Sequence, residues 1–238
     1  MSSELWLLTL TAATLGFVHT ILGPDHYVPF VMMARAGGWS RSKTLWVTFG
    51  CGLGHVLSSV LLASIGIALG VALARLEAIE SVRGELAAWL LIGFGLAYTT
   101  WGLWQGLKKR PHRHLHTHAD STVHSHVHSH TEEHVHVHAH TAEAARLTPW
   151  ILFTIFIFGP CEPLIPLLMY PAARSSVWGV VLVTLVFSTT TITTMLVTVL
   201  VARAGLLRIA FGTLEHYLHA FAGATIALCG LAIQFLGL

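Results

Sequence analysis

Four residues able to bind a metal ion lie close together in an otherwise apolar part of the chain. They are His19, Asp25 and His26 in the segment HTILGPDH, followed by His55 in GLGHVLSS. Imidazole nitrogen and carboxylate oxygen suit zinc, nickel, cobalt and iron, whereas magnesium and calcium prefer oxygen ligands alone. A lone buried histidine is more often a packing residue, but four such residues together predict a site for a divalent transition metal.

An internal repeat points to a second group of candidate ligands. The segment GPDHYVPFVMM near the start is matched by GPCEPLIPLLM in the second half. One constant offset relates Gly23, Pro24 and Met33 to Gly159, Pro160 and Met169, and His55 to Thr191. Cys161 and Glu162, which follow the second Gly-Pro pair, are therefore candidate ligands, while Cys161 is equally compatible with a small buried apolar role.

Both Gly-Pro pairs are expected to interrupt a helix. Proline removes a backbone donor and clashes with the preceding turn, and glycine tolerates the resulting conformation. Backbone groups left without partners at membrane depth survive only where protein or a water-filled cavity satisfies them. Two matched breaks, each followed at once by residues that can bind metal, predict a shared polar cavity rather than two simple kinks.

The composition is that of a membrane protein. Of 238 residues, 54% are hydrophobic and 10% charged, and the mean hydropathy is +0.70, whereas soluble domains have about 25% charged residues. Stretches of about 20 apolar residues are long enough to cross a bilayer, and lipid forces them to be helical. The sequence predicts six spans, near residues 5–33, 44–74, 86–107, 149–170, 178–202 and 216–237.

The expected fold is an all-α membrane helix bundle made of two inverted repeats. Each half holds three spans, and an odd number gives the halves opposite orientations; in transporters, such repeats meet near the midplane at broken helices. We expect a first repeat at 1–107, a central loop at 108–148 and a second repeat at 149–238. The start, MSSELWLL, has no basic residue, so the first span is expected to stay rather than be removed as a signal peptide.

Basic residues predict the orientation, because cytoplasmic loops are enriched in Lys and Arg. The loops after spans one, three and five contain Arg35, Arg41, Lys43, Lys108, Lys109, Arg110, Arg113, Arg146, Arg203 and Arg208. Those after spans two and four contain only Arg75, Arg83 and Arg174. The protein is expected in the cell (inner) membrane, with both termini on the outer side and the central loop in the cytoplasm. The net charge of +2 gives no reason to expect a nucleic-acid partner.

The central loop is rich in histidine and is expected to be disordered without metal, since it cannot bury enough apolar surface to offset chain entropy. Alternating histidines let a flexible chain gather several imidazoles around one ion. A solvated spacer is the alternative, but serine or glutamate would serve that purpose equally well. The predicted metal-buffering residues are His112, His114, His116, His118, His124, His126, His128, His130, His134, His136, His138 and His140.

The segments HTILGPDH and GLGHVLSS resemble motifs of the nickel/cobalt transporter superfamily, which includes nickel/cobalt permeases, efflux proteins and urease-accessory-type membrane proteins. That family has a His-x4-Asp-His signature and a Leu-Gly-His motif, whereas five residues separate His19 from Asp25 here. The extra residue turns His19 by about 100 degrees around an ideal helix. The resemblance implies transport of Ni2+ or Co2+, with Zn2+ as a further candidate, bound by Asp25, His26 and His55.

Other classes of function remain open. Membrane thiol-disulfide carriers also have Pro-Cys beside a helix break, but a dithiol cycle needs two adjacent thiols, and Asp25 occupies the position that matches Cys161. A sulfite-type anion exporter is a further alternative with a similar span plan. The chain lacks a Gly-x4-Gly-Lys-Ser/Thr phosphate loop, so we expect a secondary transporter, with efflux as the favoured direction, and not an enzyme. We expect no tightly bound cofactor, and the sequence leaves the oligomeric state open.

Overall fold

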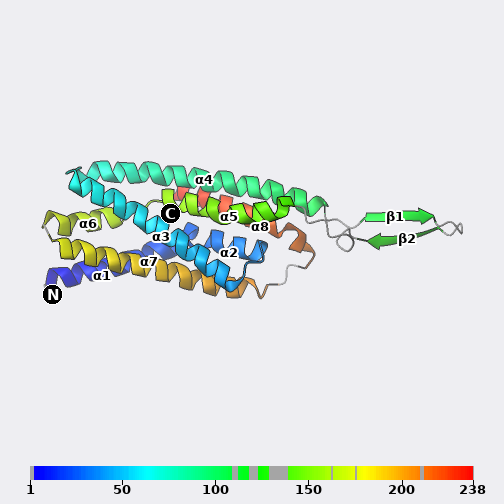
Figure 1. Cartoon of the computed structure of the whole chain (residues 1–238), viewed down its shortest axis with the longest axis horizontal. Coiled ribbons are helices and arrows are strands. Elements are labelled where there is room, and N and C mark those ends of the chain that lie inside the picture. Colours follow the sequence, from blue (N-terminus) through cyan, green and yellow to red (C-terminus); the bar gives the residue numbers. More distant parts are fainter. Residues whose placement is uncertain are drawn as a thin grey trace.

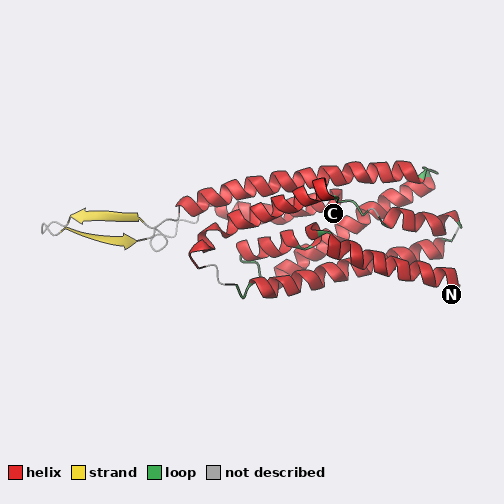
Figure 2. Ribbon diagram, turned by 180° about the vertical axis from the view of Figure 1, so that it is seen from behind, coloured by secondary structure: helices red, strands yellow, loops and turns green. Residues whose placement is uncertain are grey.

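The computed structural model describes residues 3–108, 112–117, 123–128, 139–161, 163–174, 176–209 and 212–237. Helices dominate these segments (Figure 2). The first half contains α1 (Ser3–Leu22), the 3-10 helix η1 (Pro24–His26), α2 (Val28–Ala36), α3 (Arg41–Ala68) and α4 (Leu73–Lys108). The second half contains α5 (Ala139–Phe158), α6 (Leu164–Ala173), α7 (Val177–Leu206), the 3-10 helix η2 (Gly212–Tyr217) and α8 (Leu218–Leu236).

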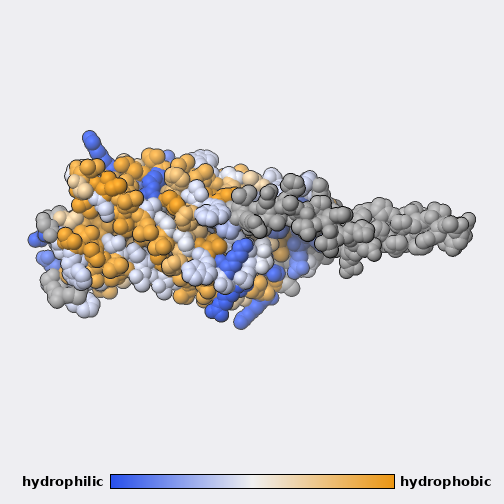
Figure 3. Space-filling view, in the orientation of Figure 1, coloured by the Kyte–Doolittle hydropathy of each residue, from blue (hydrophilic) through white to orange (hydrophobic). Residues whose placement is uncertain are grey.

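Within the described residues, five helices are long and apolar enough to cross a membrane, namely α1, α3, α4, α7 and the segment Leu214–Leu236 that contains α8. Their outward faces carry large apolar side chains: Trp6 is 64%, Leu61 is 61% and Phe235 is 69% exposed. Hydrophobic residues accordingly cover much of the bundle surface (Figure 3). So extensive an apolar surface suits lipid rather than water, and the predicted all-α membrane bundle is confirmed.

The remaining apolar segment, predicted as the fourth span, is divided. α5 ends at Phe158 and α6 begins at Leu164, with the Gly159-Pro160 pair between them. The first predicted span is divided in the same way, because α1 ends at Leu22 and η1 begins at Pro24. Both expected helix breaks are therefore present at the two Gly-Pro pairs.

The two halves repeat one pattern of elements. α1 and α5 each have 20 residues, α2 and α6 have nine and ten, and α3 and α7 have 28 and 30. In Figure 1, α1 and α5 run in opposite directions along the bundle, as do α3 and α7. The second half is therefore an inverted counterpart of the first, with the predicted repeat visible in the order, length and direction of its helices.

α2, α4 and α7 all finish at the same end of the bundle, away from the N-terminus (Figure 1). At this end, β1 (His112–Thr117) pairs antiparallel with β2 (Val123–His128). The expected disorder of the central loop without metal stays a prediction. Its boundary differs, however: α5 begins at Ala139, ten residues before the predicted span at 149, because the Ala-rich segment there has high helix propensity.

α4 also begins earlier than its predicted span, at Leu73 rather than near residue 86. The sequence prediction stopped at the charged residues between these points and assigned Arg83 to a loop. That assignment was wrong: Arg83 lies inside α4, where its guanidinium pairs with Glu80. A charged residue with a nearby partner of opposite sign can remain helical within a bundle, although it ends the apolar stretch seen in the sequence.

Close packing of α4 on α8 depends on small residues. A Cβ atom at Gly102 would collide with the backbone of Ala220, and one at Gly106 would lie 2.6 Å from the ring of Tyr217. The spacing of these two glycines in the sequence is typical of close helix contact. Two buried apolar clusters complete the bundle, one around Phe30 and Phe156 and the other around Phe187 and Leu164.

Candidate metal centre

The first helix break turns the chain back on itself beside α1. The backbone N–H of Gly23 still bonds to the carbonyl of His19, and η1 then begins at Pro24, which has no N–H to continue the helix. A Cβ atom at Gly23 would lie 2.5 Å from Nδ1 of His26. Glycine at this position therefore allows the His26 ring to fold against the break, back towards His19.

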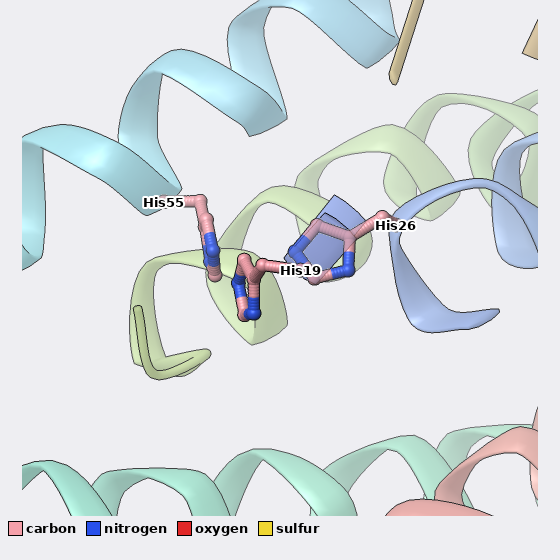
Figure 4. Close-up of side chains that lie close together, drawn as sticks. All are labelled: His19, His26 and His55. Carbon is pink, nitrogen blue, oxygen red and sulfur yellow. The ribbon is translucent and has the colours of Figure 1, made fainter. Parts of the chain in front are cut away.

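Three histidines meet at this break. His19 lies on α1, His26 on η1 and His55 on α3, and one ligand nitrogen from each lies within 4.8 Å of the other two. The ring centroids of His19 and His26 are 4.7 Å apart, and those of His26 and His55 are 5.1 Å apart. Figure 4 shows the three rings pointing towards one another. Since tetrahedral coordination needs nitrogens about 3.3 Å apart, ion binding would draw the rings together.

In His26 and His55 the Nδ1 atom lies near oxygen acceptors, which leaves the Nε2 atom available to bind a metal ion. Nδ1 of His26 lies 3.1 Å from both Asp25 Oδ1 and the carbonyl oxygen of Gly23, and Nδ1 of His55 lies 3.4 Å from the carbonyl oxygen of Phe156. Nε2 of His26 and Nε2 of His55 are buried without a partner among the described residues. A proton held on Nδ1 by these acceptors leaves a lone pair on Nε2, which is the arrangement of metal-binding histidines.

Asp25 contacts His26 on the ring nitrogen, Nδ1, that does not face the other two histidines. Its carboxylate accepts from Nδ1 of His26, so its first role in this geometry is to hold that ring and its tautomer. Cys161, which is fully buried, has its Sγ atom 4.0 Å from Nε2 of His19. The other predicted ligand of the second half, Glu162, lies outside the described residues.

The second helix break supplies one wall of the site. In a continuous helix the carbonyl of Phe156 would accept from residue 160, which is a proline without an N–H. This carbonyl instead accepts from the N–H of Gly159 and faces Nδ1 of His55. A Cβ atom at Gly159 would lie 3.0 Å from that same nitrogen. The two breaks, which the sequence predicts as a matched pair, thus meet at His55.

A cavity of about 510 Å³ adjoins the cluster between α1, α4 and the ends of α6 and α8. His19, Asp25 and His26 line it, together with the polar residues Ser81, Glu85 and Gln234. The ring of Phe156 lies near those of His26 and His55, and it packs against Phe30 with centroids 4.8 Å apart in a buried apolar cluster. The three histidines therefore lie between a cavity with polar residues in its lining and a buried aromatic contact.

No family model, no curated protein and no solved structure matches this chain. The resemblance to nickel/cobalt transporters consequently stays a prediction. The geometry of the site is three imidazoles at a break in an apolar helix, two of them buried. The Nδ1 atoms of His26 and His55 lie near oxygen acceptors.

Cys161 lies in a different buried cluster from the other two cysteines. Cys161 belongs to the apolar cluster around Phe187, whereas Cys51 and Cys229 belong to the cluster around Phe30, and no disulfide joins any of the three. Thr191, the repeat counterpart of His55, is fully buried beside Gly16. The second half thus offers a hydroxyl where the first half offers an imidazole.

The histidines of the central loop are described only in part. The backbone register of the hairpin pairs His112 with His128, His114 with His126 and His116 with His124. Five others, His118, His130, His134, His136 and His138, lie outside the described residues. Metal buffering by the loop therefore stays a prediction.

Sequence analysis missed a polar group next to the site. Glu80, with 1% of its side chain exposed, and Arg83 reach from α4 towards α3 and α5. The signal available in the sequence was their separation of three residues, which places opposite charges on one helix face. What the sequence does not show is that Arg83 bonds to α3 and α5, which are distant from it along the chain.

Proposed function

We propose that this protein is a membrane transporter of divalent transition metal ions, with nickel or cobalt as the first candidates. The single observation that carries the proposal is the cluster of His19, His26 and His55, two of them buried, at the point where two inverted repeats are broken. Ionisable residues within membrane helices are rare and generally mark a substrate or ion pathway. Broken helices of inverted repeats form the substrate sites of many secondary transporters.

The ligand chemistry favours a borderline transition metal over magnesium or calcium. Three imidazole nitrogens give a nitrogen-rich site, whereas the hard cations prefer six or more oxygen ligands. Cys161 adds a sulfur atom next to His19, and Asp25 orients His26 and adds a negative charge near the entering cation. Water in the adjoining cavity would carry a hydrated ion to the histidines before its water ligands are exchanged for imidazole.

Alternating access provides the transport step. In this conformation the cavity leads to His19 and His26, and we propose that the packed rings of Phe30 and Phe156 form the closed gate. Movement of one repeat against the other would close the first path and separate the two aromatic rings. The hairpin of β1 and β2 lies beyond the end of the bundle at which α4 finishes (Figure 1), so in this proposal the histidine-rich loop meets the ion outside the bundle.

The experiment measures radioactive nickel and cobalt in cells that express the unmutated chain, His26→Ala or His216→Ala. An importer raises the accumulated metal and an exporter lowers it, so either sign supports transport and also gives its direction. His26→Ala should abolish the effect, whereas His216, which is exposed on η2, is the matched histidine control. Metal accumulation that is the same for the unmutated chain and His26→Ala would contradict the proposed site.

Sulfite offers the corresponding test of the alternative class. The same proteins are reconstituted in proteoliposomes. The vesicles are loaded with nickel, cobalt or sulfite, and the flux of each solute is compared. Metal flux that stops with His26→Ala and no sulfite flux is the expected result. Sulfite flux that is indifferent to His26→Ala would replace the metal proposal with an anion exporter.

A further inference from the structure

A buried ion pair lies beside the metal centre but is not part of it. Nη1 of Arg83 is 2.7 Å from Oε1 of Glu80, one helical turn earlier on α4. The side chain of Glu80 is 1% exposed and that of Arg83 is 17% exposed. Burying two charges is costly unless good geometry and further hydrogen bonds offset the loss of hydration. The other contacts of the Arg83 guanidinium therefore indicate the role of this pair.

The second arm of the guanidinium joins two other helices. Nη2 of Arg83 donates to Oγ of Ser58 on α3 and to the carbonyl oxygen of Ile157 on α5, each at 2.7 Å. The hydroxyl of Ser58 in turn donates to the carbonyl oxygen of His55 at 2.8 Å. One side chain of α4 therefore ties the helical turn that carries His55 to the broken end of α5.

The carbonyl of Ile157 needs this donor because of the helix break. The last carbonyls of a helix have no intrahelical partner, and a cation near that end interacts favourably with the helix dipole. α5 ends at Phe158, and the chain then turns at Gly159 and Pro160. At membrane depth water is scarce, so a protein side chain must supply the missing donor. Arg83 does this for Ile157, next to the carbonyl of Phe156 that faces His55.

We propose that Arg83 is a positioning residue that holds the broken end of α5 against α3, and that Glu80 fixes the guanidinium for this task. The inference concerns the helix break and goes beyond the proposed function; its effect on metal affinity rests on that function. Loss of Arg83 would let the Gly159-Pro160 segment move away from His55. A charge pair that only stabilises α4 would have no such effect.

The first experiment needs no metal. In a chain that carries Cys51→Ala and Cys229→Ala, Cys161 is the single thiol, and it follows Pro160 directly in the break. The rate at which a maleimide alkylates this buried thiol reports opening of the segment. Arg83→Met should raise the rate at least tenfold, and Arg83→Lys, which keeps one donor group and the charge, should give an intermediate rate.

Two further variants separate positioning from charge balance. The double variant Glu80→Gln/Arg83→Met leaves no unpaired charge, so it should recover the thermal stability that Arg83→Met loses while keeping the fast alkylation. Arg75→Met is the matched control, because Arg75 is an exposed arginine on the same helix. Alkylation as slow in both Arg83 variants as in Arg75→Met would overturn the proposal, as would recovery of the slow rate by the double variant.

The second experiment measures Co2+ affinity by calorimetry and the Co2+ absorption spectrum for the same set of proteins. Arg83→Met and the double variant should both bind Co2+ at least tenfold more weakly, with a changed spectrum, whereas Arg75→Met should match the parent. If the parent does not bind Co2+, the proposed function fails while the alkylation result still decides the role of Arg83. Unchanged affinity alongside fast alkylation would confine Arg83 to the break and remove its effect on the metal site.

Discussion

Gly84 of α4 faces Pro160 so closely that a Cβ atom at position 84 would lie 2.9 Å from the Cγ atom of the proline ring. The contact joins the middle of α4 to the second helix break, one residue from Arg83. Gly84 also lines both the large cavity and a small void of about 20 Å³ beside His55. The wall of the candidate metal centre therefore depends on the absence of a side chain at this position.

Gly84→Ala should push the break away from α4. A proline ring is not a flexible chain end that can rotate aside, so the segment itself must shift, and overpacking of this kind costs about 1–3 kcal/mol. We expect a melting temperature in detergent lower by several degrees and reduced nickel flux. Gly93→Ala on the same helix is the control, because nothing lies within 4 Å of its added Cβ atom; a melting temperature as low for Gly93→Ala would show that the effect is not specific to the break.

The helix breaks were predictable because proline and glycine act locally, and the spans because charges are scarce in them. Arg83 and Glu80 were misassigned for the opposite reason. Their charges shorten the apolar stretch, and only the contacts with Ser58 and Ile157, residues of two other helices, explain why they are buried. His19 illustrates the same limit: its spacing from Asp25 departs from the family motif, yet the turn at η1 brings its ring beside His26.

The interface between α4 and α8 gives a second test of packing. A Cβ atom at Gly102 would collide with the backbone nitrogen of Ala220, which cannot rotate out of the way. Gly102→Ala should therefore separate the two helices and lower the melting temperature by more than Gly84→Ala does. Gly50→Ala is the control on α3, where an added Cβ atom meets nothing within 4 Å. Equal melting temperatures for Gly102→Ala and Gly50→Ala would contradict the observed approach of α4 to α8.

Asp25→Asn tests how the carboxylate contributes to the site. The amide keeps the size of the side chain but removes the charge that holds the Nδ1 proton of His26. Loss of a carboxylate that orients a metal-binding histidine typically weakens metal binding by about 10- to 100-fold, and we expect Co2+ affinity to fall in that range. Glu85→Gln, on the cavity wall, is the matched control. An affinity loss far beyond 100-fold for Asp25→Asn would instead identify Asp25 as a direct ligand.

The histidine-rich loop should bind metal independently of the bundle site. The hairpin register sets histidine opposite histidine at every second pair, from His112 and His128 to His116 and His124, and alternating histidines let a chain gather several imidazoles around one ion. Replacing the twelve loop histidines by serine should lower the number of Co2+ ions bound per chain while leaving one site with unchanged affinity. His26→Ala should do the reverse, removing one site and leaving the loop sites. Equilibrium dialysis of both variants and the double variant measures the stoichiometry. A loop variant that binds as many ions as the parent would show that the loop is a spacer, because the imidazoles would then have no part in holding metal.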